Sequence, residues 1–286
     1  MWIEKKPFGS CFELSSGSIR ALVAPEMGMS LASFTIGGIQ ILDTSRLKDF
    51  LLTRKGLGPL ILPHFNCEGF SPEDKIEELK EKFPHIEELE KIGVDHPFQH
   101  GLGRYVSWYA EESEDSITGF LTGDMQYMGY KLKTLAGFDF EARVSFRIAP
   151  DSLIVAFDVT GEKPIATGIH YYYDLVDRNS AEIELTERDG STRKIKLDRP
   201  YDDTFHPGSR FGDYTNCSLK TRNYRLDTVF KVKGKPEEIF ESLVIFSPEE
   251  SGFICIEPLS YYPGKGPTKT QNSGVIMLRP TFPGYR

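Results

Sequence analysis

Short runs of β-branched and aromatic residues, separated by turn residues, recur along most of this sequence. The clearest is the stretch 138–157, FDFEARVSFRIAPDSLIVAF, in which apolar and polar residues alternate as far as Ile148 and a Pro-Asp-Ser turn leads into a second apolar run. Alternation with a period of two puts one face of a strand in a core and the other in water, and the turn between the runs is typical of a hairpin. Similar runs include SIRALVAP, LASFTIGGIQILD, ESLVIFS and GVIMLRP. Because hardly any helical periodicity lies between them, we predict an all-β protein, a large antiparallel β-sandwich rather than alternating βαβ units.

One segment has helical periodicity instead. In SPEDKIEELKEKFPHIEELEKIG, Ser71 stands where an N-cap would, Pro72 takes the first helical position and Asp74 completes a capping box. The pattern predicts a short helical insertion around residues 71–92, which would be either a lid over a cleft or a surface insertion packed on the sheet. No repeat, low-complexity tract or linker divides the chain, so we predict that residues 1–286 form a single domain.

Composition limits the classes of partner. With 39% hydrophobic residues among 286, the chain is able to bury a substantial core. A formal net charge of −8 disfavours nucleic acid and anionic membranes, both of which bind basic surfaces, and leaves neutral small molecules open. No apolar run approaches the length of a membrane span. The N-terminal residues lack the apolar core of a signal peptide, so we expect a cytoplasmic protein.

Cysteines and histidines form no metal-binding pattern. The four cysteines are far apart and make no C-x-x-C pair, which disfavours a zinc knuckle, a redox motif or a disulfide framework. Cys255, in FICIE, is expected to act as a small buried hydrophobe. His96 and His100 have the spacing of ligands on a metal-binding helix, but Pro97 and two glycines make DHPFQHGLGR a loop. Phosphate-loop, dinucleotide and nucleophile-elbow motifs are also absent, so we predict no metal and no cofactor.

Two polar residues interrupt apolar runs in a way that suits proton transfer. His170 lies in TGIHYYYDL, and Glu257 follows four apolar residues in GFICIEPLSYYP. The simpler interpretations are a core histidine satisfied by a neighbour and a carboxylate at a strand end turned to water. Alternatively, apolar surroundings raise the pKa of Glu257, and His170 supplies its acid–base partner. The three tyrosines after His170 would place rings on both faces of a strand, at least one of them as a flat wall for a sugar or another ring.

Six segments, taken in order, resemble those of the aldose 1-epimerase (galactose mutarotase-like) superfamily. They cover nearly the whole chain: LVAPEMGMSLASFTIGGIQIL, GPLILPHFN, HPFQHGLGRYVSW, GIHYYYDL, YRLDTVF and CIEPLSYYPG. The third is similar to the family's HG…W stretch, which carries one active-site histidine, here His100. The fourth is similar to its H-x-Y-F-N-L strand, which places the second at His170. The last two correspond to segments with a substrate-binding aspartate, Asp227, and the catalytic glutamate, Glu257.

The resemblance implies a β-sandwich that binds a sugar in a cleft across its concave face and works without a cofactor. Glu257 would take the proton of the anomeric hydroxyl while His170 protonates the ring oxygen, so that the ring opens and closes again as the other anomer. The partner would be a small-molecule sugar, free or phosphorylated. The sugar-binding residues that the resemblance implies are His100, Asp227, Asn66 and Arg104.

Two departures from the family pattern bear on the substrate. Many members have an arginine after the asparagine of the GPLILPHFN segment, whereas Asn66 is followed by Cys67. Arg54, Lys55 or Arg104 would have to replace that arginine. The helical insertion also takes the place of a short β excursion beside the cleft.

The sequence therefore leaves three functions on this fold. The first is an aldose 1-epimerase, and the alternatives are a hexose-6-phosphate 1-epimerase and a non-catalytic carbohydrate-binding protein. A phosphate pocket would need converging basic residues, for which the candidates are Arg104, Lys265 and Lys269. A cupin-like metal enzyme, from a different class, is disfavoured by the histidine spacing.

Overall fold

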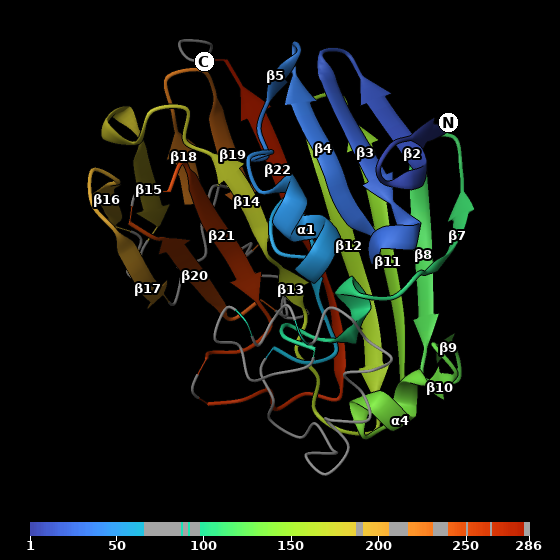
Figure 1. Ribbon diagram of the computed structural model, residues 1–286. Coiled ribbons are helices and arrows are strands. Elements are labelled where there is room, and N and C mark those ends of the chain that lie inside the picture. Colours follow the sequence, from blue (N-terminus) through green and yellow to red (C-terminus); the bar gives the residue numbers. More distant parts are fainter. Residues whose placement is uncertain are drawn as a thin grey trace.

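The computed structural model describes residues 1–65, 87, 91, 98–186, 191–205, 217–230, 240–249, 251–263 and 265–282. Two layers of antiparallel strands face one another across a common core. In Figure 1, strands β2–β4 of one layer lie over β12, β11 and β8 of the other. The described part of the chain thus has the predicted architecture, a large antiparallel β-sandwich.

The first layer is a single nine-stranded sheet. Its long central hairpin was predicted from the alternation in residues 138–148 and the turn that follows: β11 and β12 pair from Phe140 opposite Gly161 to Ala149 opposite Ser152. In spatial order the strands are β16 (Thr192–Lys196), β15 (Glu182–Thr186), β18 (Cys217–Lys220), β19 (Arg225–Val229), β22 (Gln271–Thr281), β12 (Ser152–Gly161), β11 (Phe140–Ala149), β8 (Ser116–Thr122) and β7 (Tyr109–Glu112).

The second layer consists of two sheets. One contains β1 (Trp2–Lys5), β2 (Gly9–Ser16), β3 (Ile19–Ala24), β4 (Ser30–Ile36) and β5 (Ile39–Gln40). The other contains β17 (Tyr201–Phe205), β20 (Ser242–Ser247), β21 (Phe253–Leu259), β13 (Gly168–Ile169) and β6 (Leu60–Ile61), with β14 (Tyr171–Asp174) also paired to β21. Isolated bridges, Leu31 to Gly58 and Leu42 to Tyr173, connect the two sheets.

The helical elements of the described residues are short and lie outside the sheets. They are η1 (Pro25–Met27), α1 (Leu47–Thr53), η3 (Leu102–Arg104), α4 (Leu132–Ala136) and η4 (Arg178–Ser180). Beside α4, β9 (Gln126–Tyr127) and β10 (Tyr130–Lys131) form a small hairpin. No helix within the described ranges is long and apolar enough to cross a membrane.

The core fills the space between the layers. Burial along β11 alternates with a period of two, so that Ala142, Val144 and Phe146 face inward while Arg143 and Arg147 face water. One continuous cluster joins such side chains with those of the opposite layer, including Phe34. Each large apolar side chain that is fully buried stabilises the fold by about 2–3 kcal/mol, which explains why the layers stay together without a disulfide among the described cysteines.

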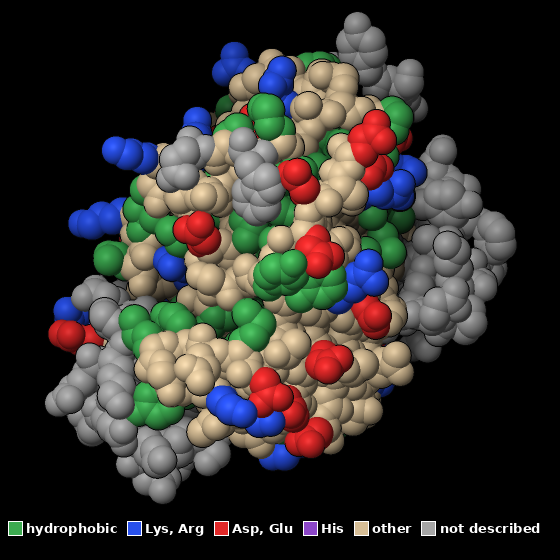
Figure 2. Space-filling view, turned by 90° about the vertical axis from the view of Figure 1, so that its right-hand side faces the viewer, with side chains coloured by type: hydrophobic (Ala, Val, Ile, Leu, Met, Phe, Trp, Pro, Cys, Tyr) green, Lys and Arg blue, Asp and Glu red, His purple; other side chains and the backbone are tan. Residues whose placement is uncertain are grey.

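Charged side chains occupy the outside. At the β7 edge, shown in Figure 2, acidic and basic side chains are interspersed among apolar ones, and the described atoms there form no continuous patch of one sign. The predicted helical insertion around residues 71–92 lies outside the described residues, apart from Glu87 and Lys91. These two are helical and form an ion pair with a 3.2 Å N–O distance.

The turn at residues 98–104 depends on a glycine. Gly101 has a φ of +91°, and a Cβ built there would lie 2.1 Å from the carbonyl oxygen of Leu62. We expect Gly101→Ala to lower the free energy of unfolding by about 3 kcal/mol, because backbone strain adds to a clash that no side-chain movement relieves. Urea denaturation followed by circular dichroism measures this change.

Gly17→Ala is the matched control. Gly17 also has a positive φ, +56°, but a Cβ there meets nothing within 4 Å. Gly17→Ala should lower the free energy of unfolding by about 1 kcal/mol, because only the left-handed backbone conformation disfavours the alanine. Equal losses in the two variants would contradict the close approach described for Gly101.

Candidate active site

Side chains along strand β21 alternate between its two faces, and this alternation decides which face Glu257 occupies. Ile254 and Ile256 belong to the core between the layers. Phe253 and Cys255 lie on the opposite face and form a separate apolar cluster there. Glu257 shares that face and is only 2% exposed. The carboxylate is therefore not a strand end turned to water.

His170 stands directly across from this carboxylate. It is the residue between β13 and β14, which both pair with β21, and the register pairs Tyr171 with Ile256 and Gly168 with Leu259. The Nε2 atom of His170 lies 3.2 Å from Oε1 of Glu257. Sheet register therefore brings together two residues that are 87 positions apart in the chain.

The three tyrosines after His170 do lie on both faces of β14. Tyr171 and Tyr173 are buried in the main core. Tyr172 points to the same side as His170, and its ring stacks on the imidazole with centroids 4.9 Å apart and an interplanar angle of 21°. The stack limits rotation of the His170 ring, so its nitrogen stays directed at Glu257.

His100 approaches the pair from a separate loop. Its ring centroid lies 4.7 Å from that of His170, and equally 4.7 Å from that of Phe65. The backbone N–H of His100 donates to the carbonyl of Phe65, and its φ is +63°. A non-glycine residue held at positive φ is uncommon, and such conformations cluster at functional sites.

A cavity of about 280 Å³ opens over these residues. Aromatic and aliphatic side chains form its walls, and several polar groups converge on it, the combination found in small-molecule sites. The lining residues are Lys55, Phe65, Gln99, His100, His170, Tyr172, Asp202, Val244, Phe246 and Glu257.

Burial sets the protonation of the central pair. It raises the pKa of Glu257 well above its usual value, an effect that the nearby charge of Arg104 opposes. Burial also lowers the pKa of His170 well below its usual value, and the positive charge of Arg104 adds to that. Both shifts favour the neutral forms, so they favour a pair that holds one proton, on Glu257, and carries no net charge. An acid and a base stand within hydrogen-bond distance of each other.

Two cations, Arg104 and Lys55, lie at the cavity. Arg104 is fully buried, and its Nη2 donates to the carbonyl of Arg54. Its Nε and Nη1 atoms have no hydrogen-bond partner among the described residues. Lys55 reaches the cavity itself, where burial, followed by repulsion from Arg104 and Arg46, lowers its pKa to about 8. This end of the site is therefore electropositive.

The predicted site residues do not all meet. Glu257, His170 and His100 line the cavity, whereas Arg104 is enclosed behind it. Asp227 lies on β19 in the nine-stranded sheet, where it accepts a 2.8 Å hydrogen bond from Nε of Arg225, and it does not line the cavity. Asn66 lies outside the described residues.

Asp202 is the carboxylate that the structure places in the cavity instead of Asp227. It comes from β17, where it pairs with Phe246, which in turn pairs with Cys255. Sequence reasoning missed it because PYDDTF looks like a turn followed by a strand, and only the pairing β17–β20–β21 puts it beside Glu257. Lys55 was named among three possible cations, and the structure selects it as the one that lines the cavity.

One set of possible metal ligands coincides with this site. Among the described residues, donor atoms of His170, Cys255 and Glu257 lie within 4.8 Å of one another. The phosphate-pocket candidates Lys265 and Lys269 do not line the cavity; Lys269 instead pairs with Glu241 at 2.7 Å.

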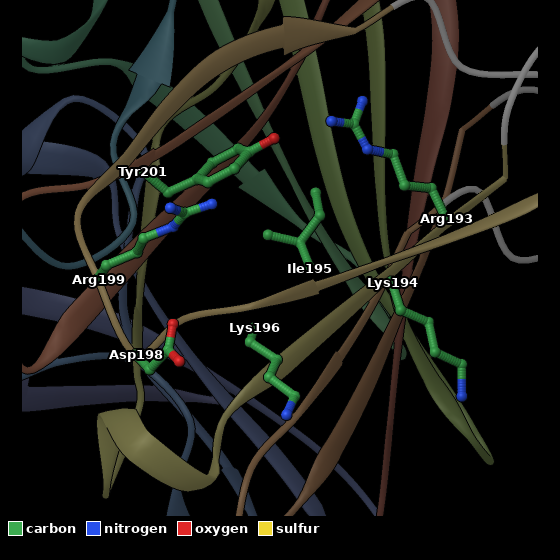
Figure 3. A pocket seen from close by; sticks show the side chains of 7 residues that line it. All are labelled: Arg193, Lys194, Ile195, Lys196, Asp198, Arg199 and Tyr201. Carbon is green, nitrogen blue, oxygen red and sulfur yellow. The ribbon is translucent and has the colours of Figure 1, made fainter.

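A second hollow, where β16 and β17 follow one another, has a different character (Figure 3). It has a volume of about 360 Å³ and is lined by Arg193, Lys194, Ile195, Lys196, Asp198, Arg199 and Tyr201. None of its polar lining residues is buried, and Lys194 pairs with Glu184 at 3.1 Å. Basic side chains on an edge strand commonly prevent pairing with other chains, so the cavity at Glu257 is the candidate active site although it is smaller.

Comparisons with known proteins support the architecture. No protein-family model matches the sequence, and a comparison with curated proteins gives no match. Among solved structures, a galactose mutarotase-like protein from Clostridium acetobutylicum superposes with a TM-score of 0.66 at 15% identity, over 96% of this chain and 95% of its own. An Escherichia coli K12 protein provisionally named aldose 1-epimerase gives 0.65 at 15%, over 95% and 99%. A galactose mutarotase related enzyme from Lactobacillus acidophilus gives 0.63 at 15%, over 95% and 97%. At these identities the likeness establishes the galactose mutarotase-like fold.

The protonation of the two histidines is directly measurable. The ordinary pKa of histidine is about 6.5. We expect the imidazoles of His100 and His170 to stay neutral well below this pH, because burial disfavours the charged ring and lowers its pKa. Nitrogen-15 NMR of the histidine rings, recorded from pH 8 to pH 5, follows each titration. The same protein in urea provides the control, since there all six histidines should titrate near 6.5. Titration of either ring at or above its ordinary pKa in the folded protein would contradict this description of the site.

Proposed function

We propose that this protein is an aldose 1-epimerase, an isomerase that interconverts the α and β anomers of an aldose without a cofactor. The observation that carries the proposal is the buried contact of 3.2 Å between His170 and Glu257 at the floor of the cavity. Anomer exchange requires one proton to leave the anomeric hydroxyl and another to reach the ring oxygen. A pair with one proton between its members supplies one acid and one base for these two transfers.

The proton moves follow from this arrangement. A shift of the shared proton from Glu257 to His170 creates a carboxylate and an imidazolium without changing the net charge of the site. The carboxylate then accepts the proton of the anomeric hydroxyl, and the imidazolium protonates the ring oxygen as the C1–O5 bond breaks and the C1 carbonyl forms. After rotation about C1–C2, the reverse transfers close the ring as the other anomer.

Neighbouring groups assist this cycle. The charge of Arg104 favours the carboxylate form of Glu257, opposing the effect of burial. The rings of Tyr172 and Phe65 offer flat apolar surfaces for the C–H faces of a sugar. Asp202 and Gln99 present polar atoms for its hydroxyl groups. Together they would hold the sugar while its open-chain form rotates.

A non-catalytic sugar-binding protein fits the site less well. Burying titratable groups is unfavourable unless they are paired, and a binder gains little from enclosing a carboxyl and an imidazole that exchange one proton. The one-proton pair therefore favours an enzyme over a binder.

Polarimetry tests the proposal. Freshly dissolved α-glucose or α-galactose should reach its equilibrium rotation faster with the protein than without it. Glu257→Gln should lower kcat/KM about 10³-fold, within the range expected for losing a general acid or base. Glu241→Gln, which alters an exposed glutamate with 44% side-chain exposure, should leave the rate unchanged. Absence of acceleration on a panel of free and phosphorylated aldoses would refute the enzyme proposal.

A phosphorylated aldose is the second candidate substrate, and the electropositive end of the cavity favours it. Lys55 lines the cavity, and no carboxylate of the described residues lies within ion-pair distance of it. Arg104 stands behind it, with two nitrogen atoms that have no hydrogen-bond partner in the described part of the chain. A phosphate group would supply the missing negative charge.

Lys55→Met separates the two substrates. We expect it to raise KM about tenfold for glucose 6-phosphate and less than about twofold for glucose, because only the phosphate loses a charged partner. Lys55→Arg keeps the charge and should restore most of the affinity. Since the pKa of Lys55 is about 8, its charge is present below that pH and lost above it, so the wild-type KM for the phosphorylated sugar should rise between pH 7 and pH 9. Equal effects on both sugars would rule out a phosphate contact at Lys55.

A further inference from the structure

Cys255 has no part in the proposed proton transfers, yet the fold puts its thiol beside them. It precedes Glu257 by two residues on β21 and shares its face. The side chain is fully buried, and it pairs across the sheet with Tyr172, whose ring stacks on His170. A sulfur, a nitrogen and a carboxylate oxygen therefore come together beside the cavity, which His170 and Glu257 line and Cys255 does not.

The spacing of these donors is near that of the ligands of a tetrahedral metal ion. Donor atoms of His170, Cys255 and Glu257 all lie within 4.8 Å of one another, and the nitrogen–oxygen pair is 3.2 Å apart. Zinc bond lengths to nitrogen, oxygen and sulfur place ligand atoms about 3.4–3.6 Å from each other. In addition, Oε2 of Glu257 and Nδ1 of His170 are buried without a hydrogen-bond partner among the described residues.

We propose that His170, Cys255 and Glu257 form a binding site for Zn²⁺ or a similar divalent transition metal, and that occupancy of this site blocks the proton transfers. Three protein ligands would leave the fourth position open toward the cavity, where a water molecule completes the tetrahedron. The mixed nitrogen, sulfur and oxygen set selects borderline metals over Mg²⁺ and Ca²⁺, which prefer oxygen alone.

Charge balance favours binding at this buried place. The ion would bind the thiolate of Cys255, the carboxylate of Glu257 and a neutral imidazole nitrogen of His170. Any proton on the thiol or the carboxyl is released to solvent as the bonds to the metal form. The two negative charges of these ligands balance the two positive charges of the ion. No oxidant or reductant takes part.

Inhibition is the functional consequence, and this step rests on the proposed epimerase function. A metal on His170 uses the lone pair that accepts the shared proton, and a metal on Glu257 uses the carboxylate that acts on the anomeric hydroxyl. Neither residue is then free to transfer a proton. The binding itself stands independently of the reaction.

Cobalt titration of the full chain provides the test, because Co²⁺ reports its ligands by absorbance. We expect one Co²⁺ per chain, a near-ultraviolet thiolate-to-cobalt band and displacement of the Co²⁺ by Zn²⁺. Cys255→Ala should abolish the band and weaken binding at least about tenfold. Cys255→Ser serves as a second variant if the alanine substitution destabilises the fold.

Cys217→Ala is the matched control, since Cys217 is equally buried but lies on β18 in the other layer. It should keep the band. Absence of the band in wild type, or its survival in both Cys255 variants, overturns the metal site. When the epimerase rate is measured, Zn²⁺ should inhibit the wild type and Cys217→Ala but not Cys255→Ala. A band without any epimerase activity supports the metal site and refutes the proposed function. Epimerase activity without a band supports the proposed function and refutes the metal site.

Discussion

The pairing of β21 with β13 and β14 is the constraint on which the candidate site depends. One register sets Tyr171 against Ile256 and Gly168 against Leu259, and it thereby sets His170 against Glu257. A slip by one residue would turn Glu257 into the core between the layers and expose Ile256. The seven buried residues of β21 make such a slip costly, because Ile254 and Ile256 already fill the core on one side. Hydrophobic packing on the inner face of β21 thus fixes the position of Glu257 on the outer face.

Burial then determines what this pair is able to do. In water, the carboxyl would be ionised at neutral pH, and the imidazole would be partly charged. In the cavity, burial shifts both pKa values so that the neutral forms are favoured, which favours a pair with a single proton. Arg104 is enclosed without a carboxylate partner among the described residues, and its charge favours the ionised form of Glu257. These opposing effects on Glu257 account for the proposed proton relay.

Some features of the fold and site were predictable because they depend on residues close together in the chain. The alternation in residues 138–148 and the turn after it predicted β11 and β12, and the run after His170 predicted rings on both faces of a strand. His170 and Glu257 stood out as polar residues within apolar runs. Asp227 shows the limit of this reasoning. It resembles a family aspartate by its local motif, but its strand belongs to the other layer, and Asp202 reaches the cavity through a pairing between β17 and β20 that no local pattern encodes.

By itself, the sequence determined the strands, the parity of side chains along each strand and the candidate acid–base residues, since these follow from the two-residue period and from side-chain chemistry. Only the tertiary structure decided which strands are neighbours, and hence that Lys55, Asp202 and His100 share a cavity with the pair while Asp227 does not. It also decided that Cys255 lies beside the proton-transfer pair. The physical reason is that β pairing joins segments far apart in the chain, and burial of the whole core selects one pairing among many that the local patterns allow.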